Sequence, residues 1–494
     1  MYLWSLLIML LLVNPACQET SRVDEPAPEN LGEIQQTIEQ LIVEGEVPSM
    51  AVGVARDGDV LWSEAFGWAD MDNDMPADPQ TMYSTASISK PFTATGIMLL
   101  AERGEIDLDE PANNYLDDSP LTGFHSPSDS VTIRKLLNHT GGLPLHYQFF
   151  YEDEDYTRPP MSESIQRYGI VVYEPGQHYQ YSNFGYGVLD EIIKRVSGKS
   201  YGDFMREELF TPLGLSRTYV GIDEDEVDNH AIRYNPEFSP LPNYDFDHRG
   251  GSAVYSTIDD LLTFGNYFTQ KRLNESESLL SKNTRQKMKA PSADHSATEE
   301  YGLGWVSREH DSGLREVWHT GSMGGVSTIL TLVPEENIVV AVLTNTRHPA
   351  TSMIARSILH KLEPDKIDSP GAGQSESEEQ HPPADYLTGQ WNGKVITHSD
   401  TLDVNFDVHK TGDIEVVLDN QSPVILEYAN YNDGTLSGII DSEIDTDDAS
   451  RRPHILQLDT VTSEDSISGA LTAISMPGER VGNALSSYIE LTRE

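Results

Sequence analysis

The stretch TASISKPFTA, residues 85–94, decides how this chain is interpreted. It places Ser87 at the start of a helix predicted over about 88–103, with Lys90 three positions later on the same helical face. A serine hydroxyl is a weak nucleophile until a base takes its proton, and a lysine whose pKa is depressed by burial can be that base. The Ser87 N–H, free at a helix N-terminus, can also donate to a developing oxyanion. Taken alone, however, the pattern also describes a helix cap followed by a surface lysine.

Two further patterns carry compatible chemistry. QYSNFGYG, residues 180–187, leads into a helix predicted over 184–197, and its Tyr181 is a candidate base that would share one proton with Lys90. VWHTGSMGG, residues 317–325, leads into an apolar strand. Its glycines allow a substrate backbone to approach closely, and the Ser322 N–H would complete an oxyanion hole with that of Ser87. Each pattern alone is also compatible with ordinary core and turn residues.

The order and spacing of these patterns resemble the three motifs of the class C β-lactamase and penicillin-binding protein family. The motifs are Ser-x-x-Lys at 87–90, Tyr-Ser-Asn at 181–183 and His-Thr-Gly at 319–321, and the resemblance spans about residues 32–362. It extends to LLNHTGGLP at 136–144, where Gly141 replaces the usual Ser. The resemblance implies an α+β fold, in which an antiparallel sheet is flanked by helices and joined to a helical subdomain. It also implies a serine hydrolase that needs neither metal nor cofactor.

The resemblance further implies a role for each motif residue. Ser87 would be acylated, while Lys90 and Tyr181 would pass its proton to the leaving group, and Tyr181 would then activate the deacylating water. The oxyanion would lie between the N–H groups of Ser87 and Ser322. The residues implied to bind the substrate, which is a small molecule or peptide with an amide or ester bond, are Asn183, His319, Thr320 and Gly321.

One departure from the family pattern concerns the substrate. Class C β-lactamases usually carry Lys where this chain has His319, and a histidine that is mostly neutral near pH 7 lacks that fixed cation. We therefore expect a D-amino-acid peptidase or carboxypeptidase, or a carboxylesterase, rather than an efficient β-lactamase. Activity toward a carboxylate-bearing substrate should rise as the pH falls through the His319 pKa. The alternative is a penicillin-binding sensor or scaffold that acylates slowly and barely turns over.

The first domain is predicted to begin and end in strands of one antiparallel sheet. Strands are expected at 50–55 and 60–68, around an Asp57-Gly58 turn, and at 326–333 and 337–344. Apolar residues at helical spacing predict further helices at 31–42 and 257–269. The loop at 145–170 is expected to shape the substrate pocket.

The rest of the chain predicts export and a second domain. Residues 1–17 resemble a signal peptide, because the apolar run Leu3–Val13 is too short to span a bilayer, so no transmembrane span is expected in the mature chain. Cys17, the only cysteine, could carry a lipid anchor, so free periplasmic or extracellular forms and an anchored lipoprotein both remain open. We expect a tether at 18–30, the hydrolase domain at 31–362 and a linker at 363–384. Alternating strands at 385–494 predict a small antiparallel barrel or sandwich, which could also cover the cleft and narrow substrate choice.

The charge of the chain excludes several classes of partner. With 80 acidic and 33 basic residues the net charge is −47, which repels nucleic acids and anionic lipids. A saline habitat and an ordinary acidic secreted protein both fit this excess. The histidines show no metal-binding spacing, and the acidic run at 441–448 predicts a solvated turn rather than a calcium loop.

Overall fold

The computed structural model describes residues 27–124, 126–222, 228–269, 278–368, 385–432, 434–476, 478 and 480–493. The predicted signal peptide, Cys17, and most of the predicted tether and linker lie outside these residues. No helix in the described ranges is long and apolar enough to cross a membrane.

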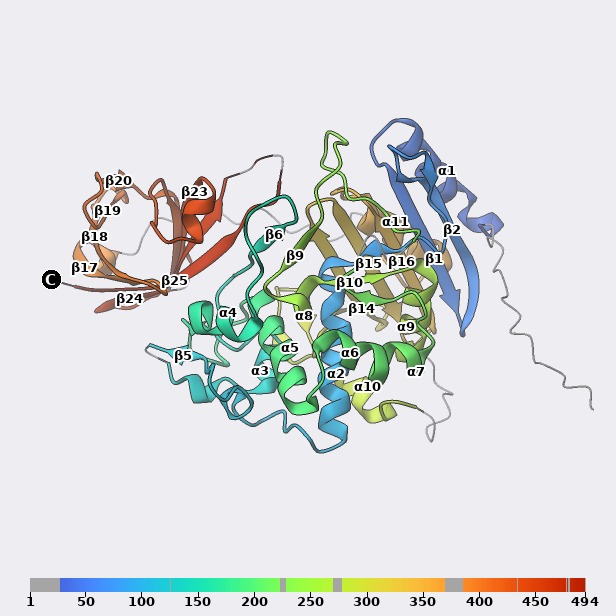
Figure 1. Cartoon of the computed structure of the whole chain (residues 1–494), viewed down its shortest axis with the longest axis horizontal. Helices are drawn as coiled ribbons and strands as arrows, with labels where there is room; N and C mark the ends of the chain where they lie inside the picture. The colour runs from blue at the N-terminus through green and yellow to red at the C-terminus, as the bar shows by residue number, and fades with distance from the viewer. Residues whose placement is uncertain are drawn as a thin grey trace, which may run out of the picture.

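An antiparallel sheet forms the centre of the first part of the chain (Figure 1). β1 (Ser49–Arg56) pairs with β16 (Ile338–Thr344). The strands expected near the two ends of residues 31–362 are therefore neighbours in one sheet. The turn between β1 and β2 places Asp57 and Gly58 at φ 54° and 93°, the conformation that an Asp-Gly hairpin favours. In sheet order the strands are β11 (Ala293–Asp294), β12 (Glu300–Tyr301), β13 (Val306–Glu309), β14 (Arg315–Met323), β15 (Val326–Val333), β16 (Ile338–Thr344), β1 (Ser49–Arg56), β2 (Asp59–Asp70) and β3 (Met75–Pro76).

Helices cover both faces of this sheet, so its central strands β1, β15 and β16 are buried on both sides. Met50, Val52 and Val54 of β1 pack into one apolar cluster with α1 (Gly32–Val43) and α11 (Ala350–Leu362). The alternate residues Ala51 and Ala55 join a second cluster that contains α9 (Ile258–Thr269). This period-2 division is what a strand between two helical layers requires.

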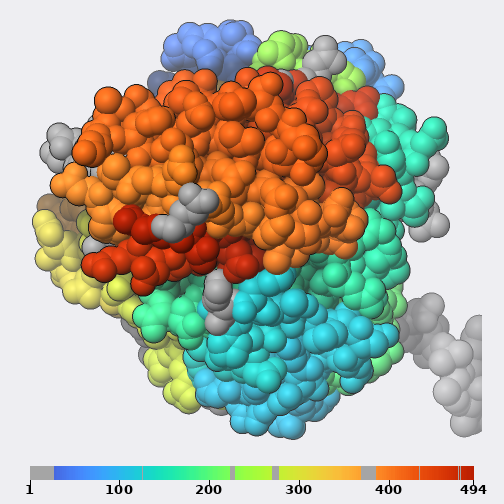
Figure 2. Space-filling model, turned by 90° about the vertical axis from the view of Figure 1, so that its left-hand side faces the viewer, coloured from blue at the N-terminus to red at the C-terminus, as the bar shows by residue number. Residues whose placement is uncertain are grey.

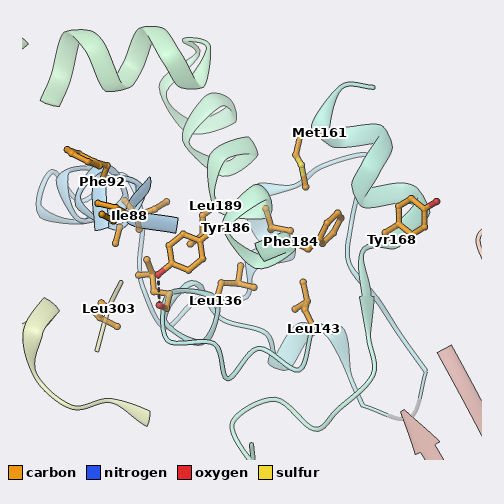
Figure 3. Close-up of a cluster of buried hydrophobic side chains, with 14 of the residues drawn as sticks. Ile88, Phe92, Leu136, Leu143, Met161, Tyr168, Phe184, Tyr186, Leu189 and Leu303 are labelled. Atoms are coloured by element: carbon orange, nitrogen blue, oxygen red, sulfur yellow. Dashed lines mark hydrogen bonds between the residues drawn. The ribbon is translucent and has the colours of Figure 1, made fainter. Parts of the chain in front are cut away.

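A helical region beside the sheet carries the first two motifs. Its central helix, α2 (Ser89–Glu102), is buried at every residue from Ser89 to Leu100, as expected for a helix enclosed on all sides. Figure 3 shows Ile88 and Phe92 at this helix in one cluster with Phe184, Tyr186 and Leu189 of α5 (Asn183–Ser197). The other helices here are α3 (Ile133–Leu137), α4 (Met161–Tyr168), α6 (Tyr201–Met205), α7 (Thr211–Leu213), α8 (Arg249–Ser252) and α10 (Lys282–Lys289).

Short strand pairs connect the helical region to the sheet and to the C-terminal part of the chain. β10 (Val254–Ser256) lies between β4 (Tyr83–Ser84) and β8 (Tyr219–Val220). β6 (Phe149–Tyr151) pairs with β9 (Tyr244–Phe246), and β5 (Thr122–Gly123) runs parallel to β7 (Ile170–Val171).

The C-terminal part is an all-β, nearly closed antiparallel barrel, filled by side chains such as Trp391, Phe406 and Leu458. In sheet order its strands are β20 (Val424–Ile425), β19 (Ile414–Leu418), β18 (Thr401–Val408), β17 (Gly389–Ile396), β25 (Ala484–Arg493), β24 (Ser466–Ser475), β23 (His454–Thr462), β22 (Thr435–Ile440) and β21 (Glu427–Asn432). Figure 2 shows the barrel, orange to red, lying directly on the cyan and green segments of the helical region.

Hydrogen bonds at several places attach the barrel to the first part of the chain. Tyr147 and Ala484 exchange two backbone hydrogen bonds of 3.0 and 2.9 Å. Asp448 accepts hydrogen bonds from Gln148, Tyr168 and Arg167 at 3.1, 2.7 and 3.0 Å. The prediction of a solvated turn at 441–448 is therefore wrong for Asp448, whose carboxylate is buried because these polar groups of the helical region surround it.

Candidate active site

The structure brings Ser87, Lys90 and Asn183 into direct contact. The Lys90 Nζ lies 3.0 Å from the Ser87 Oγ and 2.7 Å from the Asn183 Oδ1, because Lys90 follows Ser87 by one helical turn and Asn183 is the first residue of α5. A third neighbour is the backbone carbonyl oxygen of Gly251 in α8, 3.0 Å from Nζ. The amine is thus enclosed by three oxygens from three segments of the chain.

Burial lowers the pKa of Lys90 well below its ordinary value, and no charged group contributes to this shift. A neutral amine has two N–H donors and one lone pair. Since Asn183 Oδ1 and Gly251 O can only accept, they take the two donors, and the lone pair remains for the Ser87 hydroxyl to donate to. The three contacts therefore match an unprotonated lysine that can act as a base toward Ser87.

Tyr181 stands on the other side of the serine. Its hydroxyl shares a hydrogen bond with the Ser87 side chain, and its ring centroid lies 4.7 Å from Lys90 Nζ. Burial raises the pKa of Tyr181, so the phenol stays protonated. The sequence predicted that Tyr181 and Lys90 share one proton. Burial favours the form in which the phenol holds this proton and the amine is neutral, because burial disfavours both charged groups.

The backbone before Ser87 is strained and closely packed against β14. Ala86 has a φ of 47°, which is unfavourable for a residue with a Cβ. A Cβ built on Gly321 would lie only 2.2 Å from the Thr85 carbonyl oxygen and 3.0 Å from Ala86 Cβ, so glycine is required there. Ser87 and Ser322 each directly follow one of these contacting residues, so the two serines belong to segments that pack against each other.

Successive side chains of β14 point to opposite faces of the sheet, so the residues of the third motif are divided between these two faces. Thr320 and Ser322 have exposed side chains, while His319 is 3% exposed. The His319 Nδ1 donates to the Thr320 carbonyl at 2.7 Å, and its Nε2 then accepts from the Tyr301 hydroxyl at 3.0 Å. The single donor of the neutral ring is therefore already used.

Burial, with a smaller effect of Lys90, lowers the pKa of His319 to about 3. The predicted rise in activity toward a carboxylate-bearing substrate would therefore have to occur well below neutral pH. The prediction that its side chain binds substrate has no support from the hydrogen bonds either, because a ring bonded at both nitrogens has no donor to offer.

The barrel contacts the segments that carry the second and third motifs. Gln180, directly before Tyr181, donates to Asp459 of β23 at 3.5 Å. On the other side, a Cβ on Gly324 would lie 2.6 Å from Val481 Cγ2, so this barrel residue packs against the segment that follows Ser322. The loop at 145–170 takes part, since the Phe149 N–H donates to Asn483 Oδ1 at 2.9 Å.

Sequence reasoning missed the Gly251 carbonyl and the particular barrel residues that contact the motif segments. A backbone carbonyl has no side-chain signature, and contacts across 300 residues leave no local pattern. Within the described residues, no group of three or more His, Cys, Asp or Glu side chains is placed to hold a metal ion.

The comparisons with known proteins agree with this arrangement. The Beta-lactamase family model matches residues 34–363. "Penicillin-binding protein 4*" of Bacillus subtilis (strain 168) is 31% identical over 317 residues, which cover 60% of this chain and 67% of that protein.

Two solved structures share the fold. A class C β-lactamase superposes with a TM-score of 0.58 at 22% identity, covering 68% of this chain and 97% of that one. SurE with D-Leu superposes with a TM-score of 0.64 at 19% identity, covering 94% of this chain and 99% of that one. By the family match over two thirds of its length, this chain belongs to the β-lactamase family of serine hydrolases.

Proposed function

We propose that the protein hydrolyses amide or ester bonds through an acyl-enzyme on Ser87, as a D-amino-acid peptidase or carboxylesterase. The observation that supports this most is the buried Lys90 amine, whose Nζ lies 3.0 Å from the Ser87 Oγ and whose pKa is lowered by burial. This arrangement provides the serine with a base within hydrogen-bond reach.

The proposed acylation proceeds in one proton cycle. Lys90 takes the Ser87 proton as Oγ attacks the carbonyl carbon, and the oxyanion forms between the N–H groups of Ser87 and Ser322. Tyr181, which is still protonated, gives its proton to the departing nitrogen or oxygen as the scissile bond breaks. Lys90 then returns its extra proton to the phenolate.

Deacylation reverses these roles. Tyr181 first passes its proton to Lys90; the phenolate then takes a proton from the water molecule that attacks the acyl carbon, and Lys90 gives its extra proton to the departing Ser87 oxygen. Asn183 would support either step with Nδ2 as a donor, since its Oδ1 accepts from Lys90.

The third motif argues against substrates that need a fixed cation. His319 is neutral and its donor is occupied, so it does not replace the lysine that binds the carboxylate of an antibiotic. We therefore favour an aminopeptidase or esterase over a carboxypeptidase or β-lactamase. The structural similarity to SurE, whose reported complex contains D-Leu, makes D-amino-acid derivatives the first substrates to test.

The test is a panel of a chromogenic cephalosporin, a p-nitrophenyl ester and a D-alanyl anilide, assayed with the parent and with Ser87→Ala. We expect turnover of the anilide or the ester, little turnover of the cephalosporin, and loss of all activity in S87A. A stoichiometric burst without steady-state turnover would instead support the alternative, a penicillin-binding sensor. Residual full activity in S87A would reject the proposal.

Export is part of the proposal and rests on residues 1–17 alone. Fractionation of cells that express the parent and Cys17→Ser would test it. Export of both with membrane association only in the parent would indicate a lipid anchor, and retention of the parent in the cytoplasm would contradict export.

A further inference from the structure

The carbonyl that holds Lys90 belongs to a short segment clamped between two helices. α8 lies against α2 and α5, and its Gly251 oxygen accepts from Lys90. A Cβ on Gly251 would lie 3.2 Å from the Asn183 oxygen and 3.6 Å from Lys90 Nζ. A small displacement of α8 would therefore move an acceptor of the lysine directly.

Gly250, the preceding residue, is fixed from both sides. Its N–H donates to Oδ2 of Asp190 on α5 at 2.8 Å, and its carbonyl accepts from Thr93 Oγ1 on α2 at 2.6 Å. No side chain fits there, since a Cβ would lie 2.4 Å from the Tyr186 oxygen and 2.9 Å from Asp190 Cβ. A continuous series of contacts thus runs from Asp190 through Gly250 and Gly251 to Lys90 and Ser87.

Asp190 is a buried carboxylate on α5. It is 6% exposed, and its neighbour Glu191 is buried as well. Burying a carboxylate is unfavourable unless it makes a compensating contact, and a charged acceptor gives a stronger hydrogen bond than a neutral one. The hydrogen bond from the Gly250 N–H is such a contact, together with the charges of Arg249 and Arg158.

We propose that Asp190 is a positioning residue for the active-site lysine: its carboxylate fixes Gly250 and thereby aims the Gly251 carbonyl at Lys90. This inference rests on the proposed role of Lys90 as the base. It extends the site to a residue that touches neither the substrate nor Ser87.

The charged groups around Asp190 determine when this contact changes. Burial raises the pKa of Asp190, the hydrogen bond from the Gly250 N–H lowers it, Glu191 on the same helix raises it, and Arg249 of α8 and Arg158 lower it, so that the pKa is about 7. Tyr201 of α6 packs nearby as a neutral phenol whose pKa is raised by burial. Asp190 therefore changes charge near neutral pH.

The other side of α8 does not titrate in the same range. There, burial lowers the pKa of His248, so its ring is neutral at neutral pH. Burial opposes ionisation of Asp247, but the imidazoles of His146 and His248 lower its pKa overall, so it stays charged. Asp190 and Asp247 are two carboxylates next to α8. Only Asp190 loses its charge as the pH falls below about 7, and its hydrogen bond with the Gly250 N–H then weakens.

The experiment measures the rate at which a fluorophosphonate acylates Ser87, over about pH 5.5 to 8.5, in the parent, Asp190→Asn and Asp260→Asn. Asp260 is the matched control: it is buried, its pKa is raised chiefly by burial, and it accepts a backbone N–H from Arg217 at 2.8 Å. We expect the parent rate to fall through a transition near pH 7. D190N should be roughly tenfold slower at high pH and lack that transition, whereas D260N should keep the parent profile.

The outcomes separate this inference from the proposed function. If the parent itself is not labelled at Ser87, the proposed function fails. If the parent is labelled and D190N keeps the parent's rate or its pH transition, Asp190 is not a positioning residue. Should D190N not fold, Thr93→Val tests the opposite contact of Gly250: a slower rate with the parent's transition supports the inference, and an unchanged rate overturns it.

Discussion

Replacing Gly321 with alanine tests the close contact between the third motif and the segment that carries Ser87. In the parent, β14 approaches the chain before the serine with no room for a side chain. A Cβ at position 321 would lie 2.2 Å from the Thr85 oxygen and 2.3 Å from Thr328 Oγ1. One of these atoms belongs to the backbone and cannot rotate away, so the strand or the serine turn must move.

The size of the displacement sets the expected loss of activity. An ordinary contact begins at 3.4 Å, so the Thr85 oxygen and β14 must separate by about 1 Å. A misplacement of about 1 Å in a catalytic constellation can reduce a rate by about 100-fold. Overpacking of a tight core position also lowers the free energy of unfolding by about 1–3 kcal/mol. We therefore expect G321A to fold but to acylate about 100-fold more slowly.

The assay is the fluorophosphonate acylation rate of Ser87, with denaturant unfolding measured on the same samples. Gly202→Ala is the control, because a Cβ there meets only Val220 Cβ at 3.7 Å, an ordinary contact. It should match the parent in both measurements. Acylation of G321A at the parent's rate, with the variant folded, would refute the claim that this contact aligns the two N–H groups.

Three further predictions concern charge and the barrel. The raised pKa of Asp190 contributes stability that is present below its unfolded pKa and lost as the pH rises through about 7. The difference in unfolding free energy between the parent and D190N should therefore fall by about 3 kcal/mol between about pH 5 and 8.5. Urea unfolding measures this difference, and a difference that does not change with pH would contradict the burial argument. His319→Gln should leave the shape of the kcat/KM profile for a neutral ester unchanged between about pH 5 and 8, because the parent ring is already neutral there; loss of a transition in that range would show that His319 titrates. Asn483→Ala removes the acceptor of the Phe149 N–H and should raise KM for bulky substrates. The rate of fluorophosphonate acylation should stay within about threefold of the parent rate. If N483A changes KM equally for small and bulky substrates, the barrel does not shape the substrate site.

Much of the fold followed from the three motifs and from periodicity. The apolar runs at 326–333 and 337–344 predicted adjacent strands, and β15 and β16 pair over those residues. The Asp-Gly turn and the helix that ends at Gly198 follow from local backbone preferences, which need no knowledge of distant contacts.

Protonation and orientation at the site depend on distant parts of the chain and were not predictable from the motifs. Burial lowers the pKa of Lys90 because α2 is enclosed by distant parts of the chain, such as the Gly251 carbonyl 161 positions away, and nothing in Ser-x-x-Lys shows that enclosure. Side chains alternate between the two faces of a strand, but the sequence does not show which face is buried. It therefore could not tell whether the His319 or the Thr320 side chain is exposed. Asp190 stands next to Glu191 on the same helix, and only the contact with Gly250 distinguishes the two carboxylates.

The excess of negative charge and the chemistry at Ser87 act in separate parts of the molecule. Although the chain carries 80 acidic residues, burial is the only cause of the lowered Lys90 pKa, so the surface carboxylates do not reach the amine. Salt screens exposed charges over about 10 Å at 0.1 M and affects buried groups much less. Added salt should therefore raise the free energy of unfolding by weakening surface repulsion, while the acylation rate of the folded protein changes by less than about twofold. A steep dependence of that rate on salt, at constant folded fraction, would mean that surface charge sets the protonation of Lys90, and the argument from burial would then fail.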